Sequence, residues 1–168
     1  AVSNHRVYVA STETRLQVVD VTNPASVPVV GRVHTPGPYA RGVAVYGKRA
    51  YVADDFAGVE IVDLTDPAHP ALMGNVNTPG YAYDLVAAGR YLYVADSGRG
   101  LQVIDVSDPA APQIIGSLDT PGSAKQVAIA GSYAFLADGI AGFKVIDISN
   151  PALPVIVAGL PTENASEG

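Results

Sequence analysis

The chain contains no cysteine and no tryptophan, and it has a single methionine and few charged residues. Without cysteine it can form no disulfide, and it offers no thiolate nucleophile or thiolate metal ligand. No apolar run approaches the roughly 20 residues that span a bilayer, so we expect no membrane span. The sequence opens Ala-Val-Ser-Asn, without a methionine or a charged leader. We therefore expect a processed or excised product whose targeting signal lies outside this sequence.

Apolar residues make up 48% of the 168 residues and charged residues 15%, which is the composition of a folded chain rather than a disordered one. The formal net charge of −6 argues against a surface that binds nucleic-acid phosphates. Nine of the twelve aspartates stand at repeated positions. Most of the acidic residues are therefore explained by turns that recur in each copy of the repeat, rather than by a surface patch that binds a cationic partner.

One segment occurs four times along the chain, and its clearest copy is GLQVIDVSDPAAPQIIG at residues 100–116. The equivalent aspartates are 43, 42 and 42 residues apart, and they are Asp20, Asp63, Asp105 and Asp147. We therefore expect four structural units, followed by a polar tail at residues 163–168. The units are expected at about residues 1–35, 36–78, 79–120 and 121–162.

Each unit has the pattern of four short β-strands. Runs of β-branched residues are interrupted by Gly, Pro, Asn or Asp about every ten residues. In the third copy the expected strands are 84–88, 91–95, 101–106 and 113–118.

The turns place these strands relative to one another. Gly89 stands between the first and second strands, where a tight hairpin needs a positive φ, and Asn4 takes that place in the first copy. Residues 1–3 are then the stub of a first strand. An Asp-(Val/Leu/Ile)-(Ser/Thr)-(Asn/Asp)-Pro turn ends each third strand, and a second proline precedes each fourth strand. Proline is tolerated at a strand start or an edge, which puts the fourth strand at the edge of its sheet.

The third strand of each unit is apolar on both sides. In 101–106, leucine and valine point one way, and isoleucine and valine point the other way. A strand that is apolar on both faces is covered on both faces. Antiparallel four-stranded sheets that recur every ~42 residues, each packed between neighbours, describe the blades of an all-β β-propeller. A parallel β-helix would have a shorter period, and a β-sandwich would not keep identical turns.

The same segments resemble a known family. Leu101-Gln-Val-Ile-Asp and Val59-Glu-Ile-Val-Asp each precede an apolar residue and then Ser/Thr-Asp-Pro. They are similar to the LVIVD repeat of bacterial and archaeal surface or exported proteins, and the resemblance covers about residues 5–160. It implies a β-propeller, often part of a larger extracellular polypeptide, with no shared catalytic activity or catalytic residue set.

The last copy departs from the others. It keeps Thr162 but has Glu-Asn where the other copies have Pro-Gly. Gly159 is one residue beyond the place of Gly31, Gly74 and Gly116, which leaves the register of its outer strand open. No segment replaces the short first strand at residues 1–3, so an unclosed arc would expose two apolar faces that should associate. We expect a segment of a larger propeller, or a half-ring that joins further copies, rather than a closed four-blade monomer.

Loops that vary between the copies are the candidates for a binding face. The loops from fourth to first strand and from second to third strand emerge on one side, which is the usual binding surface of propellers. The first set places seven side chains near the mouth of a central channel: Tyr39, Arg41, Tyr81, Tyr83, Asp84, Lys125 and Gln126. The second set places Phe56 and Arg99 on the rim. Tyr and Arg suit a binding surface because they bury area and keep a polar tip; the alternative is ordinary solvated loop residues.

Metal binding and catalysis find little support. Asp54, Asp55 and Asp96 offer the oxygen ligands that Ca²⁺ prefers, but no run approaches the about six to eight ligands it takes. We expect no cofactor, and we expect these aspartates to bond the backbone of their own hairpin turns. The three histidines, at 5, 34 and 69, fall at unrelated repeat positions. No Gly-x-Ser-x-Gly is present, and no serine stands beside a histidine.

These observations predict a non-catalytic β-propeller scaffold or interaction module, extracellular or at the cell surface. Its expected partners are a protein, and either other blades of a longer chain or further copies of itself; nucleic acid is not expected. Two alternatives stay open. The blades could carry part of the active-site face of an enzyme, or the chain could be a structural subunit that assembles through its open blade faces.

Overall fold

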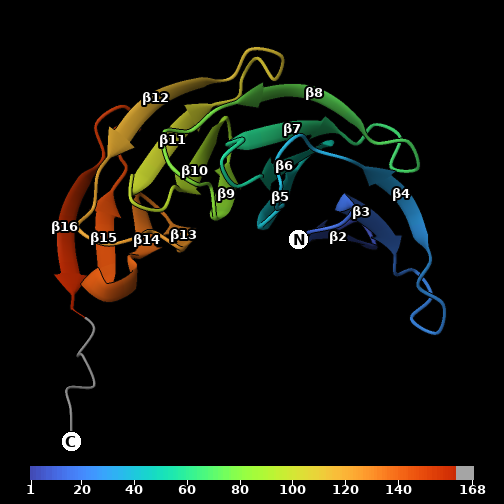
Figure 1. Cartoon of the computed structure of the whole chain (residues 1–168), viewed down its shortest axis with the longest axis horizontal. Coiled ribbons are helices and arrows are strands. Elements are labelled where there is room, and N and C mark those ends of the chain that lie inside the picture. Colours follow the sequence, from blue (N-terminus) through green and yellow to red (C-terminus); the bar gives the residue numbers. More distant parts are fainter. Residues whose placement is uncertain (162–168) are drawn as a thin grey trace, which may run out of the picture.

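The computed structural model describes residues 1–161, and it arranges them as four antiparallel sheets of four strands along an open arc (Figure 1). The first two blades comprise β1 (Val2–Ser3), β2 (Arg6–Ser11), β3 (Arg15–Asp20), β4 (Val29–Val33), β5 (Gly42–Tyr46), β6 (Arg49–Ala53), β7 (Val59–Asp63) and β8 (Ala71–Val76). The third and fourth comprise β9 (Asp84–Ala88), β10 (Tyr91–Ala95), β11 (Leu101–Asp105), β12 (Gln113–Leu118), β13 (Gln126–Ala130), β14 (Tyr133–Ala137), β15 (Phe143–Asp147) and β16 (Val155–Leu160). A single 3-10 turn, η1 (Gly139–Ala141), is the one helical element of residues 1–161. The prediction of four four-stranded blades is confirmed.

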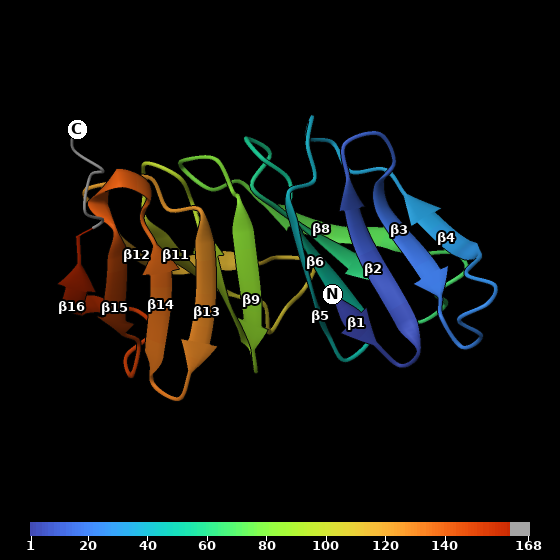
Figure 2. The ribbon, with the colours of Figure 1, turned by 90° about the horizontal axis from the view of Figure 1, so that it is seen from below.

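Within every blade the strands pair in chain order, from the innermost to the outermost. Figures 1 and 2 show β5, β9 and β13 towards the centre of the arc and β4, β8, β12 and β16 along its outside. β1 pairs with β2 through Val2↔Val7 and Ser3↔Arg6, so residues 1–3 form the expected stub. No helix in the described part of the chain has the length and apolarity needed to cross a membrane. The predicted tail, 163–168, and the Thr162-Glu-Asn segment lie outside the described residues.

The first hairpin of each blade adopts the predicted backbone conformation. Gly89 has φ of +62°, and Asn4 has φ of +49° at the equivalent turn of the first blade. Asparagine tolerates this left-handed region better than most residues because its side chain bonds locally. The expected strand at 101–106 ends one residue early, at Asp105, and the Val106 amide bonds the Arg90 carbonyl (2.9 Å) in the turn between β9 and β10.

The register of the last strand is the same as in the other blades. Val103 pairs with Gly116 and is followed by a bulge, and Val145 pairs with Ala158 and is followed by the same bulge. Gly159 pairs instead with Lys144. The displaced glycine therefore does not shift the strand, and Ala158 takes the place that glycine has in the other three blades.

The core lies between the blades rather than at one centre. Leu16 and Val18 of the first blade pack with residues of the second, which include Val52. Corresponding clusters fill the junction of the second and third blades and that of the third and fourth. The third strands of the second and third blades are buried on both faces, as their two-sided apolar pattern predicts. Those of the first and fourth blades, at the ends of the arc, have fully buried residues on one face only.

The outer ends of these junctions are closed by contacts between backbones. A Cβ added to Gly74 would lie 2.2 Å from the carbonyl oxygen of Pro109 in the next blade. Gly31 and Gly116 meet the following blade in the same way. We call these residues the outer glycines; they lack a side chain because the neighbouring blade occupies its place.

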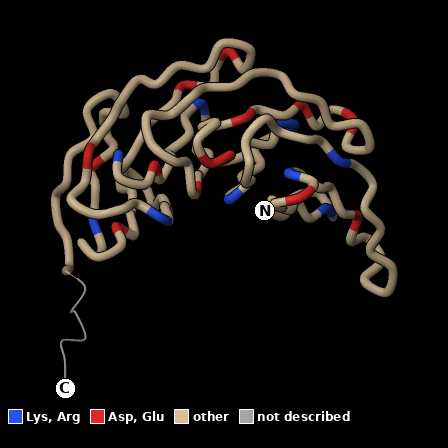
Figure 3. Tube along the Cα trace, in the orientation of Figure 1, with Lys and Arg blue, Asp and Glu red and all other residues tan. Residues whose placement is uncertain are grey.

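Most aspartates of the repeat act in turns, as predicted. The side chain of Asp105 accepts from the Ser107 amide (2.9 Å), and that of Asp108 accepts from the Ala110 amide (3.1 Å). Arg90 also pairs with Asp105, and its hydrogen bond, with those from Ser107, holds the pKa of Asp105 well below its usual range. Figure 3 shows the acidic positions spread along the whole arc. They form no single acidic surface.

The prediction for the aspartates that follow the second strands was right for Asp55, which accepts from the Phe56 amide of its own turn (2.9 Å), and wrong for Asp54 and Asp96. The carboxylate of Asp96 is buried and binds the preceding Thr-Pro-Gly segment instead of its own hairpin: it accepts from Thr78 Oγ1 (2.6 Å) and from the Gly80 amide (2.9 Å). Asp138 does the same with Thr120 and Gly122. This segment connects two blades, so the bond joins residues that are 16 to 18 positions apart. Burial raises the pKa of Asp96, and the bonds from Thr78 and Gly80 oppose that shift.

Replacing Asp96 with alanine is expected to lower the free energy of unfolding by about 2 kcal/mol, because a buried hydroxyl and a buried amide lose their acceptor. Urea unfolding of the wild type and the variant measures the difference. Asp119→Ala, which removes an exposed carboxylate one residue before Thr120, is the matched control and should change stability by less than about 0.5 kcal/mol. Equal losses in both variants would contradict a specific role for Asp96.

Candidate functional site

The predicted binding face near the central channel is formed by the residues that immediately precede the innermost strands β5, β9 and β13. Ala82 is fully buried just before β9, and Ala40 and Ala124 are buried at the equivalent places. Because side chains alternate in extended backbone, the residue after each alanine turns away from the core. Those residues are Arg41, Tyr83 and Lys125, one from each of three consecutive blades.

Backbone hydrogen bonds hold this row in place. The amide of Tyr83 donates to the Ala95 carbonyl (2.9 Å), and the amides of Arg41 and Lys125 make the same bond in their own blades. Two of the preceding alanines also bond the hairpin of the neighbouring blade: the amide of Ala82 donates to the Asp55 carbonyl (3.0 Å) and that of Ala124 to the Ser97 carbonyl (2.9 Å). The row therefore stands on backbone that is bonded both within and between blades.

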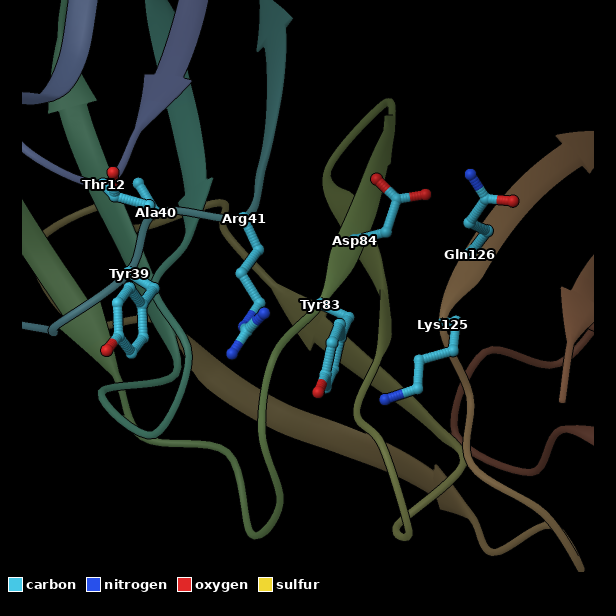
Figure 4. Close-up of a pocket in the computed structure, with 8 residues that line it drawn as sticks. All are labelled: Thr12, Tyr39, Ala40, Arg41, Tyr83, Asp84, Lys125 and Gln126. Carbon is cyan, nitrogen blue, oxygen red and sulfur yellow. The ribbon is translucent and has the colours of Figure 1, made fainter. Parts of the chain in front are cut away.

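The side chains of the row stack on one another. Figure 4 shows Tyr39, Arg41, Tyr83 and Lys125 side by side, with aromatic and cationic groups in alternation. The Arg41 guanidinium carbon lies 5.4 Å from the Tyr39 ring centroid and 4.3 Å from that of Tyr83. Lys125 Nζ lies 3.5 Å from the centroid of the Tyr83 ring. Cations over aromatic faces attract, so each member of this row orients the next.

The two cations differ in their partners. Arg41 Nε and a terminal guanidinium nitrogen both bond the Asp55 carboxylate, which is only 5% exposed at its side chain. Lys125 forms no ion pair with any of residues 1–161. The positive charge of Lys125 therefore faces the pocket unneutralised, while Arg41 is oriented by its carboxylate.

Asp84 lies on the opposite wall of the same pocket, next to Gln126 (Figure 4). Its Oδ2 accepts from the Val127 amide (3.1 Å) of the next blade, which is 43 residues along the chain. Asp84 thus connects two inner strands, and this structural role reduces what it can offer a ligand.

Together these side chains line a pocket of about 410 Å³. Six of the nine sequence-predicted residues lie in its wall: Tyr39, Arg41, Tyr83, Asp84, Lys125 and Gln126. Thr12 and Ala40 also line it, and neither was predicted. Thr12 occupies the same repeat position as Asp55, so the loop alignment of the first blade could have revealed it.

The other three predicted residues lie outside the pocket wall. Tyr81 is 53% exposed and Phe56 is 63% exposed. Arg99 is exposed, and its side chain covers Gly80, where an added Cβ would lie 3.1 Å from Arg99 Cγ. These three residues therefore do not line the pocket.

The pocket can bind a ligand through charge and ring contacts. Lys125 and Arg41 are hydrogen-bond donors without acceptor capacity, and the tyrosine hydroxyls donate and accept. These side chains favour a ligand that carries an anionic group next to a planar group such as an aromatic ring. Among residues 1–161, no group of three or more His, Asp or Glu side chains is placed to hold a metal ion.

Comparison with known proteins places the chain in a repeat family. The LVIVD repeat matches residues 1–35, 37–78, 79–120 and 121–162. No curated protein matches the chain. Among solved structures, the chain is similar to the computationally designed Ika8 protein with a TM-score of 0.76 at 9% identity, over 95% of this chain and 47% of that one. The chain thus spans about half of Ika8, and the likeness concerns the fold alone.

Proposed function

Because the chain belongs to the LVIVD-repeat family and its blades form an open propeller-like arc, we propose that it is a non-catalytic interaction scaffold, extracellular or at the cell surface. In this role the pocket around Tyr83 binds a protein partner, and the open blade faces join further blades. The location rests on the family resemblance. Removal of the protein by a protease added outside intact native cells would test it.

The alternating row of Tyr39, Arg41, Tyr83 and Lys125 is the observation that supports a binding role. Three blades contribute to it, and their backbone bonds position the side chains before any partner arrives. Pre-ordered aromatic and cationic side chains lose little conformational entropy on binding, which is why such residues carry much of the energy of interfaces. The row therefore favours a segment that presents an acidic side chain beside an aromatic or other flat group.

The test is a selection of displayed random peptides on the full chain, followed by titration of the best binder by fluorescence polarisation. We expect acidic residues to be enriched, and Tyr83→Ala and Lys125→Ala to weaken binding about tenfold each through the lost cation–π contact and charge. Lys48→Ala is the control, because Lys48 is an exposed cation at a hairpin outside the pocket. Peptides that bind both pocket variants as tightly as the wild type would refute the proposed site.

A further inference from the structure

The first and fourth blades form the two ends of the arc (Figure 1). Each has an apolar sheet face that packs against no other blade of residues 1–161. On the fourth blade the open face consists of Phe135, Phe143, Val145, Val157 and Leu160, and on the first blade of Val7, Val9, Val19 and Val21. Phe143 is 38% exposed, Leu160 is 70% exposed and Val9 is 38% exposed. Apolar surface of this extent on a soluble blade marks an interaction site.

The equivalent residues at the internal junctions indicate which kind of blade each end face would pack against. Phe135, Phe143 and Val145 stand where the third blade has Tyr93, Leu101 and Val103, which are buried against the fourth blade. Val7, Val9 and Val19 stand where the second blade has Ala50, Val52 and Val62, which are buried against the first blade. The fourth-blade face is therefore the kind that receives a following blade, and the first-blade face is the kind that packs on a preceding one.

The side chains of the two end faces can be compared with those of the internal junctions. Phe143 stands where the third blade has Leu101, and it stacks on Phe135 with ring centroids 5.9 Å apart. At the place of Val7 the other blades have Ala50, Leu92 and Ala134, and at the place of Val19 they have Val62, Ile104 and Ile146. Both end faces therefore carry apolar side chains at the positions that fill the internal junctions.

The residues that serve chain connections are changed at these two ends. Ser11 stands where Asp54, Asp96 and Asp138 bind a Thr-Pro-Gly segment. The first blade therefore lacks the carboxylate that holds the connecting segment at the internal junctions. Ala158 replaces the outer glycine, and its methyl group would hold the outer edges apart relative to internal junctions, where a Cβ would lie 2.2 Å from a carbonyl. The contact then rests on the aromatic and valine residues nearer the centre.

We infer that two copies of this chain pair head to tail, fourth-blade face against first-blade face at both ends, and close one ring. The four blades match 47% of the Ika8 chain, which agrees with an arc that two copies complete. The inference rests on the scaffold role proposed above and not on its pocket. Loss of peptide binding and loss of pairing are measured separately, so either can fail alone.

The test is the mass of the full chain in solution by light scattering after size exclusion. We expect twice the monomer mass of 17.3 kDa. Phe143→Asp and Val9→Asp, one on each face, should each give a monomer, because a desolvated carboxylate would lie in the junction. Leu72→Asp is the control: Leu72 is 45% exposed on β8, away from both faces, and should leave the dimer intact.

Mixing the two single variants distinguishes head-to-tail pairing from pairing of like faces. A head-to-tail ring made from one copy of each variant keeps one wild-type junction, so the mixture should recover a dimer. Pairing of like faces would leave one of the two variants fully dimeric alone. That result, a wild-type monomer, or open polymers in place of a dimer would overturn the inference. Circular dichroism of each variant confirms that the monomers remain folded.

Discussion

Replacing Gly74 with alanine is expected to lower the free energy of unfolding by about 3 kcal/mol, as severe overpacking does. The added methyl carbon would lie 2.2 Å from the Pro109 carbonyl oxygen and 3.2 Å from the Ala110 Cα, both in the backbone of the next blade. Neither atom can turn aside as a side chain would. The second and third blades must separate at their outer edge, and the apolar junction behind them loses contact.

Chemical unfolding of Gly74→Ala and of Gly98→Ala gives the comparison. Gly98 has nothing within 4 Å of its added Cβ and lies outside the left-handed region, so its substitution should be neutral or slightly stabilising. Similar stabilities of the two variants would contradict the close backbone contact. Ala158 stands at the equivalent place in the fourth blade, whose outer edge meets no other blade among residues 1–161.

Replacing Glu60 with glutamine is expected to stabilise the protein by about 3 kcal/mol at slightly alkaline pH. Glu60 is only 2% exposed between the first and second blades, and its Oε1 is buried without a hydrogen-bond partner. Burial, with a smaller contribution from the Asp54 carboxylate, raises the pKa of Glu60 from 4.5 to about 7.

Repeat geometry supports the same conclusion independently of the pKa. At the equivalent place, Gln102 Nε2 donates to the Arg99 carbonyl (2.9 Å) and Lys144 Nζ donates to the Ala141 carbonyl (2.5 Å). The side chain at this repeat position therefore donates a hydrogen bond to the carbonyl of the residue three positions earlier. An ionised carboxylate cannot donate this hydrogen bond, whereas a protonated glutamate or a glutamine can.

The direction of the pH dependence follows from the raised pKa of Glu60. Below about pH 4.5 the side chain is protonated in both the folded and the unfolded state, and it carries no penalty. As the pH rises from 4.5 to about 7, the unfolded chain releases the proton while the folded chain retains it, so stability falls. Above about 7 the loss is complete.

Urea unfolding across this pH range tests the expectation. Glu60→Gln should match the wild type at the acidic end and exceed it at the alkaline end. The reciprocal variant Gln102→Glu should introduce a second pH-dependent loss at the next junction. If the stability of Glu60→Gln varied with pH as much as that of the wild type, the assignment would be wrong.

Local chemistry explains why so much of the fold could be predicted. The strands, their edge prolines and the turn aspartates such as Asp105 depend on neighbours within a few residues, and four copies repeat the same information. Asp96 was predicted wrongly because its partners, Thr78 and Gly80, belong to the connection between blades. Short-range turn rules do not reach across 16 to 18 residues.

The candidate site was predictable only in part, for a related reason. Repeat alignment places Arg41, Tyr83 and Lys125 at one position of three blades, which suffices to group them. Their stacking and the pairing of Arg41 with Asp55 depend on how closely adjacent blades approach. Glu60 gave no signal at all, because a single glutamate in a strand carries no mark of its burial between two sheets.

The sequence by itself determined the period, the strands, the order of strands within each blade and the need for cover on both blade faces. All of these follow from the alternation of side chains and from turn residues that act locally. Only the tertiary structure decided which polar groups meet between blades and which glycines lie against the backbone of a neighbouring blade. Those outcomes depend on the angle and distance between sheets, which packing sets and local sequence does not encode.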